Sequence, residues 1–434
     1  MGAAGWTLSG MAIGKSADVA WIFNSMPSMR TLFPKEIMTL PVLVAALGYF
    51  IDVYDIWIFG ANRVASLTDI GVPQEKMLDT GVLLLNMQMA GLFLGGFVFG
   101  ILGDKYGRTK MMFISILTYS MATLLNGMVQ SVEAYAVFRF VAGFGLAGEL
   151  GLAVTLISET LPKDKRGYGT GIIVGFGVFG ALAAATLAHY VDWRTSYYIG
   201  GVAGLALLAF RIKVHESTLF EGTREVKDRG KIRMIFNDRT RFLKFMYCVF
   251  MVLPVWYAAG VLVTFGPELI QSEYGHAIAA ASLMVWFNLF LALSDFLSAW
   301  ISQWLGSRKK VLFAFISLGF LMTAALLLSP VPLSLPMIIA LYIGVALGGG
   351  CWVLGVTTAA ESFGTNLRAT ITTIVPNFSR AAIIPMTLGL AALKDHMSLG
   401  HATMVVGAVI FTLALLGAAL IPETHSKNLD YLEE

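Results

Sequence analysis

The chain has 434 residues, of which 57% are hydrophobic and only 13% are charged. A soluble domain carries about 25% charged residues, so this composition excludes an ordinary soluble protein and indicates an integral membrane protein. The formal net charge of +3 gives no support to a nucleic-acid partner, and the two cysteines form neither a disulfide framework nor a metal-ligand pattern.

Twelve apolar segments follow one another along the chain, each close to the length of a helix that spans a bilayer. Separate runs of this length predict helices rather than barrel strands. We therefore expect an all-α membrane protein with twelve transmembrane helices. The predicted bounds are 40–61, 80–101, 111–130, 133–157, 168–190, 195–212, 243–265, 279–301, 311–328, 335–358, 370–391 and 402–421.

The first predicted helix holds two carboxylates, Asp52 and Asp55, in an otherwise apolar run. A charged side chain in hydrocarbon is costly, so such residues usually face a cavity, pair with a cation or carry a proton. Their spacing of three places both side chains on one face of the helix. We expect both to point into the protein interior rather than at lipid.

The loop after the second helix, 100–110, is rich in glycine and holds Asp104 and Arg108. The glycines permit a tight turn, and Asp104 can pair across it with a cation. A simple turn that sets membrane topology would use the same residue types. Between two membrane helices, the run resembles the signature loop of the major facilitator superfamily. That resemblance implies two pseudo-symmetric six-helix bundles, and it implies that Asp104 and Arg108 belong to a cytoplasmic latch.

Three further stretches resemble the sugar, organic-ion and metabolite proton symporters of that family. They are residues 48–55 of the first helix, residues 139–149 of the fourth, and the sequence Pro422-Glu423-Thr424 after the last. These stretches place the chain in that branch without naming one substrate.

The resemblance also implies roles for the buried charges. In the resembled porters an acid of the first helix and an arginine of the fourth form the proton-coupling pair, and Asp55 and Arg139 match these positions. A static structural ion pair is the alternative. Asp52 is either a second proton site or a substrate contact. Glu149, near the middle of the fourth helix, is either a proton relay or a residue that packs helices together.

The fourth and tenth helices end with the same charge pattern. Glu159 precedes Arg166 by seven residues, Glu361 precedes Arg368 by seven, and the two copies are 202 residues apart. A repeat of this kind is typical of transporters built from duplicated bundles. We expect both pairs to form structural salt bridges at the inner face.

One long polar connection, 213–242, divides the twelve helices into six and six. Basic residues concentrate in the loops on one side of the predicted helices, which by the positive-inside rule places both termini in the cytoplasm. The expected organisation is a cytoplasmic N-terminal segment, an N-terminal bundle, a cytoplasmic linker, a C-terminal bundle and a cytoplasmic tail, with bounds 1–36, 37–212, 213–242, 243–422 and 423–434.

Arg380 lies in the middle of the eleventh helix. A buried guanidinium needs an anion. Asp295 of the eighth helix is one candidate partner. The substrate is another, because a guanidinium fork matches a carboxylate or phosphate, and in organic-anion porters an arginine of this helix plays that role. A third alternative is that neither is its partner.

Aromatic and amide residues complete the predicted substrate cavity. A tryptophan or tyrosine in a membrane helix more often packs or lies at the interface than binds ligand. The residues we predict to contact substrate beside Arg380 are Asn377, Tyr257, Trp256, Asn288 and Asn86.

The sequence therefore predicts a monomeric, proton-coupled symporter for a small organic anion or polar metabolite, in a bacterial inner membrane. It needs no cofactor, no metal and no nucleic acid, and it is not an enzyme. The alternatives are a proton-driven antiporter that exports a drug-like compound or siderophore, and a transporter-like receptor that binds without carrying.

Overall fold

The computed structural model describes residues 39–160, 166–211 and 233–425, and the regular elements in these ranges are helices. Each of the twelve predicted apolar segments is helical, which confirms the all-α fold class. Among the described residues, nine helical stretches are long and apolar enough to cross a membrane. Residues from Leu40 onward form one compact unit, and the account below concerns that unit alone.

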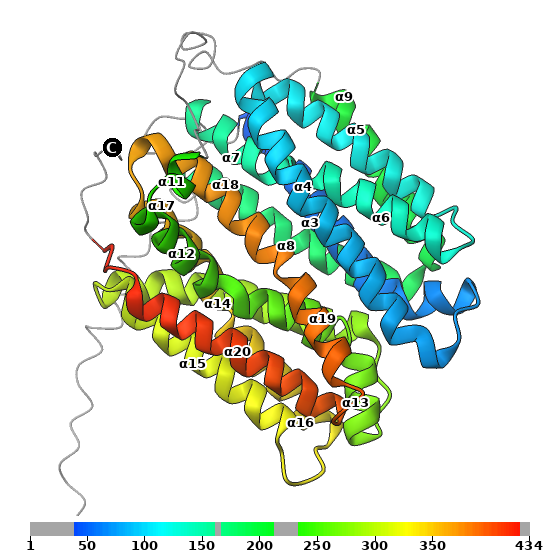
Figure 1. Ribbon diagram of the computed structural model, residues 1–434. Helices are drawn as coiled ribbons and strands as arrows, with labels where there is room; N and C mark the ends of the chain where they lie inside the picture. The colour runs from blue at the N-terminus through cyan, green and yellow to red at the C-terminus, as the bar shows by residue number, and fades with distance from the viewer. Residues whose placement is uncertain (1–38, 161–165, 212–232, 426–434) are drawn as a thin grey trace, which may run out of the picture. The chain divides into compact units, whose positions relative to one another are not determined.

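The helices that precede residue 212 are called the N half below (Figure 1). Within it, α3 packs against α8 and α9, α4 against α6, and α5 against α6 and α9. The α3–α8 contact is close because Gly180 has no side chain: a Cβ there would lie 2.1 Å from the carbonyl oxygen of Phe50. The helices are α3 (Leu40–Asp69), α4 (Met77–Tyr106), α5 (Arg108–Asn126), α6 (Val132–Leu146), α7 (Glu149–Thr160), α8 (Arg166–Tyr190) and α9 (Trp193–Arg211).

The helices that follow residue 232 are called the C half. Here α12 packs against α20, and α15 lies beside α16 and α20 (Figure 1). The helices are α11 (Arg233–Asn237), α12 (Arg239–Tyr257), a π-helical turn (Ala258–Val263), α13 (Gly266–Tyr274), α14 (Ala280–Trp304), α15 (Arg308–Leu327), α16 (Leu335–Gly348), α17 (Cys351–Ser362), α18 (Thr365–Ala381), α19 (Ile383–Leu393) and α20 (Leu399–Leu420).

The fourth and tenth predicted helices are each broken near the middle. The fourth is interrupted between Leu146 and Glu149, and the tenth between Gly348 and Cys351. Both breaks lie at glycines, which weaken a helix interior. The bounds on either side of the two breaks are 202 residues apart, the same offset that relates Glu159 to Glu361. The backbone therefore repeats with the offset seen in the sequence.

The seventh and eleventh predicted helices are also interrupted. α12 carries Pro254 and passes into the π-helical turn before α13 begins. α18 ends at Ala381, directly after Arg380, and α19 carries Pro385 in its first turn. Proline removes a backbone donor and clashes with the preceding turn of a helix, which explains a break next to it. The break in the eleventh helix leaves Arg380 in the last turn of α18.

The two ends of the bundle can be told apart by their turns. At the basic end, α4 turns into α5 at Gly107 and α14 turns into α15 at Gly306, with φ of 103° and 60°, which favour glycine. Arg108 and Arg308 follow these turns directly. The end that holds Gly71, between α3 and α4, is called the opposite end below. Between the halves, α3 contacts α14, and α4 contacts α18 and α19.

Candidate functional site

Asp52 and Asp55 are both fully buried on α3, as the sequence predicted. The Thr123 hydroxyl of α5 donates to Oδ1 of Asp55 at 2.6 Å. Neither carboxylate oxygen of Asp52 has a hydrogen-bond partner among the described residues. A buried polar group without a partner is costly, so Asp52 is a candidate to take up a proton or to contact a ligand.

Arg139 lies on α6, fully buried, within electrostatic range of Asp55. Its Nη2 donates to Oε1 of Gln88 on α4, and its guanidinium lies 4.7 Å from the centre of the Phe59 ring. Arg139 and Asp55 do not form an ion pair in this structure. Each instead contacts a neutral polar side chain on a neighbouring helix, so their role as a coupling pair stays a prediction.

Glu149 begins α7 and forms a buried ion pair with Arg211, the last residue of α9. The pair lies directly against Gly48 of α3, where a Cβ would be 2.0 Å from Oε1 of Glu149 and 2.5 Å from Nη2 of Arg211. The sequence reasoning did not predict this partner, because Arg211 stands at the end of the sixth predicted helix and spacing along the chain does not show which charge it meets. The contact favours the packing role of Glu149 over the relay role.

Arg380 is 2% exposed and lies with its guanidinium 5.3 Å from the centre of the Trp256 ring. Its charge acts on Tyr49 and Asp52 of α3, across the boundary between the halves, without a direct ion pair. Asp295, the partner considered from the sequence, instead accepts a hydrogen bond from the backbone N–H of Val353 at 3.3 Å.

We call Tyr49, Asp52, Trp256 and Arg380 the central cluster. It combines groups from α3, α12 and α18, and Trp352 of α17 packs edge-on against Trp256 at 5.2 Å between ring centres. Besides the two Asp52 oxygens, Nε of Arg380 and the indole Nε1 of Trp256 are buried without a partner among the described residues. The cluster therefore offers a cation, a neutral donor, aromatic faces and a carboxylate that can take a proton.

The other predicted substrate contacts have local partners or neighbours of their own. The Tyr257 hydroxyl donates to the carbonyl of Thr403 on α20 at 2.7 Å, and Asn288 donates to the carbonyl of Met284 in its own helix at 2.9 Å. Asn377, which is 8% exposed, lies against Gly96 of α4. These placements explain how the three side chains pack, and their contact with substrate stays a prediction.

Asn86 contributes to contacts between the halves, since its Oδ1 accepts from the Thr387 hydroxyl of α19 at 2.7 Å. At the opposite end, Arg63 forms a 2.6 Å ion pair with Glu268 of α13. Lys394 pairs with Asp79 nearby. The sequence reasoning did not predict these two contacts, which join residues 205 and 315 positions apart in the chain.

The basic end holds a cluster of its own in the C half. Glu361 pairs with Arg308 at 3.1 Å and accepts from the Thr424 hydroxyl at 2.7 Å. Glu423, beyond the end of α20, accepts from the Ser307 hydroxyl and from the first backbone N–H groups of α15. Burial opposes ionisation of Glu423, but these hydrogen bonds outweigh it and lower its pKa to about 2.

The remaining predicted latch residues can be placed only in part. Arg108 is buried at the start of α5. Asp104, Glu159, Arg166 and Arg368 lie outside the residues whose side chains the structure describes. Their part in a latch stays a prediction, as does a pairing between Glu361 and Arg368.

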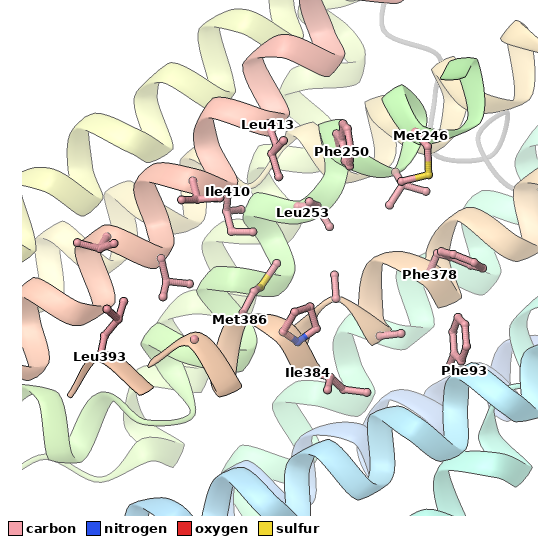
Figure 2. Close-up of a pocket in the computed structure, with 18 residues that line it drawn as sticks. Phe93, Met246, Phe250, Leu253, Phe378, Ile384, Met386, Leu393, Ile410 and Leu413 are labelled. Atoms are coloured by element: carbon pink, nitrogen blue, oxygen red, sulfur yellow. The ribbon is translucent and has the colours of Figure 1, made fainter. Parts of the chain in front are cut away.

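A large cavity of about 700 Å³ lies in the C half between α12, α18, α19 and α20 (Figure 2). Apolar side chains line it, among them Phe250, Leu253, Phe378 and Met386, and Phe93 of α4 closes one side. It contains none of the charged residues of the central cluster. Because a bound anion needs charged or hydrogen-bonding partners, the central cluster and not this cavity is the candidate site.

Among the described residues, no group of His, Cys, Asp and Glu side chains is arranged to hold a metal ion. Cys248 and Cys351 are both buried and unpaired.

Comparison with known proteins gives one family. A sequence description of the Major Facilitator Superfamily matches residues 45–384. The chain is 25% identical over 403 residues to a "Probable 4-methylmuconolactone transporter" of Cupriavidus pinatubonensis, covering 89% of this chain and 91% of that protein. It is 26% identical over 423 residues to a cis,cis-muconate transport protein of Acinetobacter baylyi, covering 91% and 97%.

The same comparison finds a benzoate transport protein of Acinetobacter baylyi, 24% identical over 375 residues, with 76% of this chain and 78% of that protein covered. Among solved structures, the xylose transporter XylE from E. coli, in a partially occluded inward-open conformation, matches with a TM-score of 0.70. That match has 15% sequence identity and covers 90% of this chain and 99% of the other. At this identity the likeness concerns the fold.

Proposed function

The chain belongs to the major facilitator superfamily of secondary transporters, and we propose that it is a proton-coupled symporter that takes up a small organic anion. The two halves would alternate between states open to either side of the membrane, with the central cluster as the substrate site.

The observation that carries this proposal is Arg380. It is a guanidinium buried between the halves, and the described residues give it no carboxylate in direct contact. A buried cation that is stable without a protein ion pair suits a site whose anion arrives with the substrate. The fork of a guanidinium binds a carboxylate through two parallel hydrogen bonds, which gives orientation as well as attraction.

The aromatic residues beside Arg380 favour a flat, unsaturated acid. The Trp256 indole lies next to the guanidinium, and the Trp352 ring packs against Trp256. The Trp256 N–H is free among the described residues to donate to a second polar group. Relatives of the chain are named for the transport of cis,cis-muconate and benzoate, which are planar carboxylates. We therefore propose an aromatic or conjugated carboxylate as the substrate class.

The proton would be carried by the buried carboxylates of α3. Asp55 lies within electrostatic range of Arg139, and Asp52 faces Arg380. Protonation of a buried carboxylate removes a charge that is costly in a low dielectric, so each can switch between two states as its surroundings change during transport.

The ion pairs at the opposite end support an orientation. Arg63–Glu268 and Lys394–Asp79 hold the halves together there. With the basic end in the cytoplasm, as positively charged loops favour, this arrangement is closed to the outside. We propose that the protein acts as a monomer in a bacterial inner membrane, with both termini in the cytoplasm.

A binding experiment tests the anion site. Purified protein in detergent is titrated with benzoate and with its neutral amide, benzamide, and binding is followed by Trp fluorescence. Arg380→Ala should abolish benzoate binding and spare any binding of benzamide, whereas Trp352→Phe should weaken both. Equal loss of both ligands in Arg380→Ala would assign Arg380 a structural role and refute the anion site.

A transport experiment tests the direction of coupling. Proteoliposomes are given benzoate on the outside while the external pH is recorded in weak buffer. Symport makes the outer medium more alkaline, and proton antiport makes it more acidic. Uptake without any pH change would refute proton coupling, and binding without uptake would favour a receptor.

A further inference from the structure

The central cluster brings together two opposite charges from different halves that do not touch. Asp52 lies on α3 of the N half and is fully buried, and Arg380 lies on α18 of the C half and is 2% exposed. Their charges interact, but they form no ion pair, and both Asp52 oxygens and Nε of Arg380 are without hydrogen-bond partners among the described residues. A direct salt bridge would have satisfied both groups, so their separation requires an explanation.

Among the described residues of the N half, the other two buried carboxylates each have one oxygen engaged. Asp55 accepts from the Thr123 hydroxyl, and Glu149 is paired with Arg211. Asp52 is therefore the carboxylate that faces the proposed substrate anchor with its acceptors unused. A substrate carboxylate bound to Arg380 would lie next to it.

We propose that Asp52 and the substrate carboxylate are alternative counter-ions of Arg380, so that the anion binds only when Asp52 has taken up a proton. This inference rests on the proposed function. Two ionised carboxylates that share one site repel each other strongly in a low dielectric. A protonated Asp52 removes the repulsion and can donate its hydrogen to the substrate. Release of the anion returns Arg380 to Asp52, which then loses its proton.

Other charged and titratable groups surround Asp52, and two of them already have partners of their own. Arg211 of α9 is held by Glu149, and Asp295 of α14 is held by the backbone of α17. The titratable and charged groups that face Asp52 or its neighbour Tyr49 are Arg380 on α18, Glu149 on α7, Tyr119 on α5, Asp295 on α14, and Tyr49 and Asp55 on α3 itself.

The exchange predicts one proton for each substrate molecule, whatever number of carboxylates the substrate carries. The dissociation constant of benzoate for the wild-type protein should therefore rise about tenfold for each pH unit above the titration of Asp52, because proton and anion binding are linked. For a monoanion such as benzoate, transport carries no net charge. For cis,cis-muconate, a dianion, the same exchange leaves one negative charge.

The first test measures benzoate binding between pH 6 and about pH 10, so that the range extends above the titration of Asp52. Asp52→Asn has nearly the same shape and cannot ionise, so its dissociation constant should stay constant over this range, at the value that the wild type reaches at low pH. Asp69→Asn, at an exposed site on the same helix, is the matched control and should keep the wild-type slope. A wild-type slope in Asp52→Asn, or loss of the slope in Asp55→Asn instead, would overturn the inference.

The second test uses the wild-type protein alone and so does not depend on a variant that folds. Uptake of benzoate into proteoliposomes should respond to a pH gradient and not to a potassium diffusion potential set with valinomycin, whereas uptake of cis,cis-muconate should respond to both. A potential-sensitive benzoate uptake would overturn the one-for-one exchange. If no carboxylate binds the wild type at any pH, the proposed function itself fails. If benzoate binds through Arg380 but Asp52→Asn keeps the slope, only the exchange fails.

Discussion

Gly48→Ala tests the buried ion pair of the N half without changing any charge. The new Cβ would lie 2.0 Å from Oε1 of Glu149 and 2.5 Å from Nη2 of Arg211, where ordinary contacts exceed 3.4 Å. To reach an ordinary contact, Oε1 of Glu149 would have to move by about 1.4 Å and Nη2 of Arg211 by about 0.9 Å. Both are buried, with exposures of 0% and 3%, so they have no solvent to move into.

The expected decrease in the free energy of unfolding results from two opposing effects. Breaking a buried pair by removing one partner costs roughly 3–5 kcal/mol, and displacing both partners approaches this range. Replacing glycine by alanine inside a helix recovers about 1 kcal/mol. The free energy of unfolding should thus fall by about 2–4 kcal/mol.

The assay is reversible unfolding in mixed detergent micelles, followed by Trp fluorescence. Gly175→Ala is the matched control, because a Cβ on Gly175 of α8 has open space around it. That control should be neutral or slightly stabilising. If Gly48→Ala is as stable as Gly175→Ala, the Glu149–Arg211 ion pair does not need the space left by Gly48, and the reasoning is wrong.

Two further changes test the ends of the bundle. Glu268→Gln removes the anion that pairs with the buried Arg63 across the two halves, so it should destabilise the state that is closed at the opposite end. A cysteine introduced at Asn86 should then react faster with a thiol reagent. An unchanged labelling rate would refute a role of this ion pair in closing the opposite end. Glu423→Gln removes a charged cap from the N-terminus of α15 and should cost about 1 kcal/mol of stability at neutral pH. Because the pKa of Glu423 is lowered from 4.5 to about 2, the difference in stability between variant and wild type should be complete above pH 4.5 and shrink as the pH falls towards 2. Thermal unfolding at several pH values measures this difference. A stability difference that does not depend on pH would contradict the capping role of Glu423.

The positions of the helices, and the burial of the charged residues on them, could be predicted from the sequence. Hydrophobic length alone predicts twelve segments, and all are helical. Burial of Asp52, Asp55, Arg139 and Arg380 also follows from their place in apolar spans, because a charge does not remain in contact with lipid.

Partners of these charges were harder to predict. The family resemblance paired Asp55 with Arg139, but the rotation of the helices about their axes places Thr123 next to Asp55 and Gln88 next to Arg139. Spacing within a sequence carries no information about such rotations. Arg211 illustrates the same limit, since it is the last residue of α9 and its ion pair with Glu149 joins residues 62 positions apart in the chain.

The interrupted helices have a mechanical consequence. At the two glycine breaks the chain makes tight turns: the N–H of Gly148 donates to the carbonyl of Gly145, and the N–H of Gly349 donates to the carbonyl of Ala346. Part of the regular hydrogen-bond pattern of the helix is therefore already absent there. Bending at such a hinge sacrifices few backbone bonds, unlike bending an intact helix. Each of these helices can then tilt within one leaflet of the bilayer while its other segment keeps its packing. The segments at the basic end and at the opposite end can therefore move independently. A variant that fixes the segments at one end can leave those at the other end mobile.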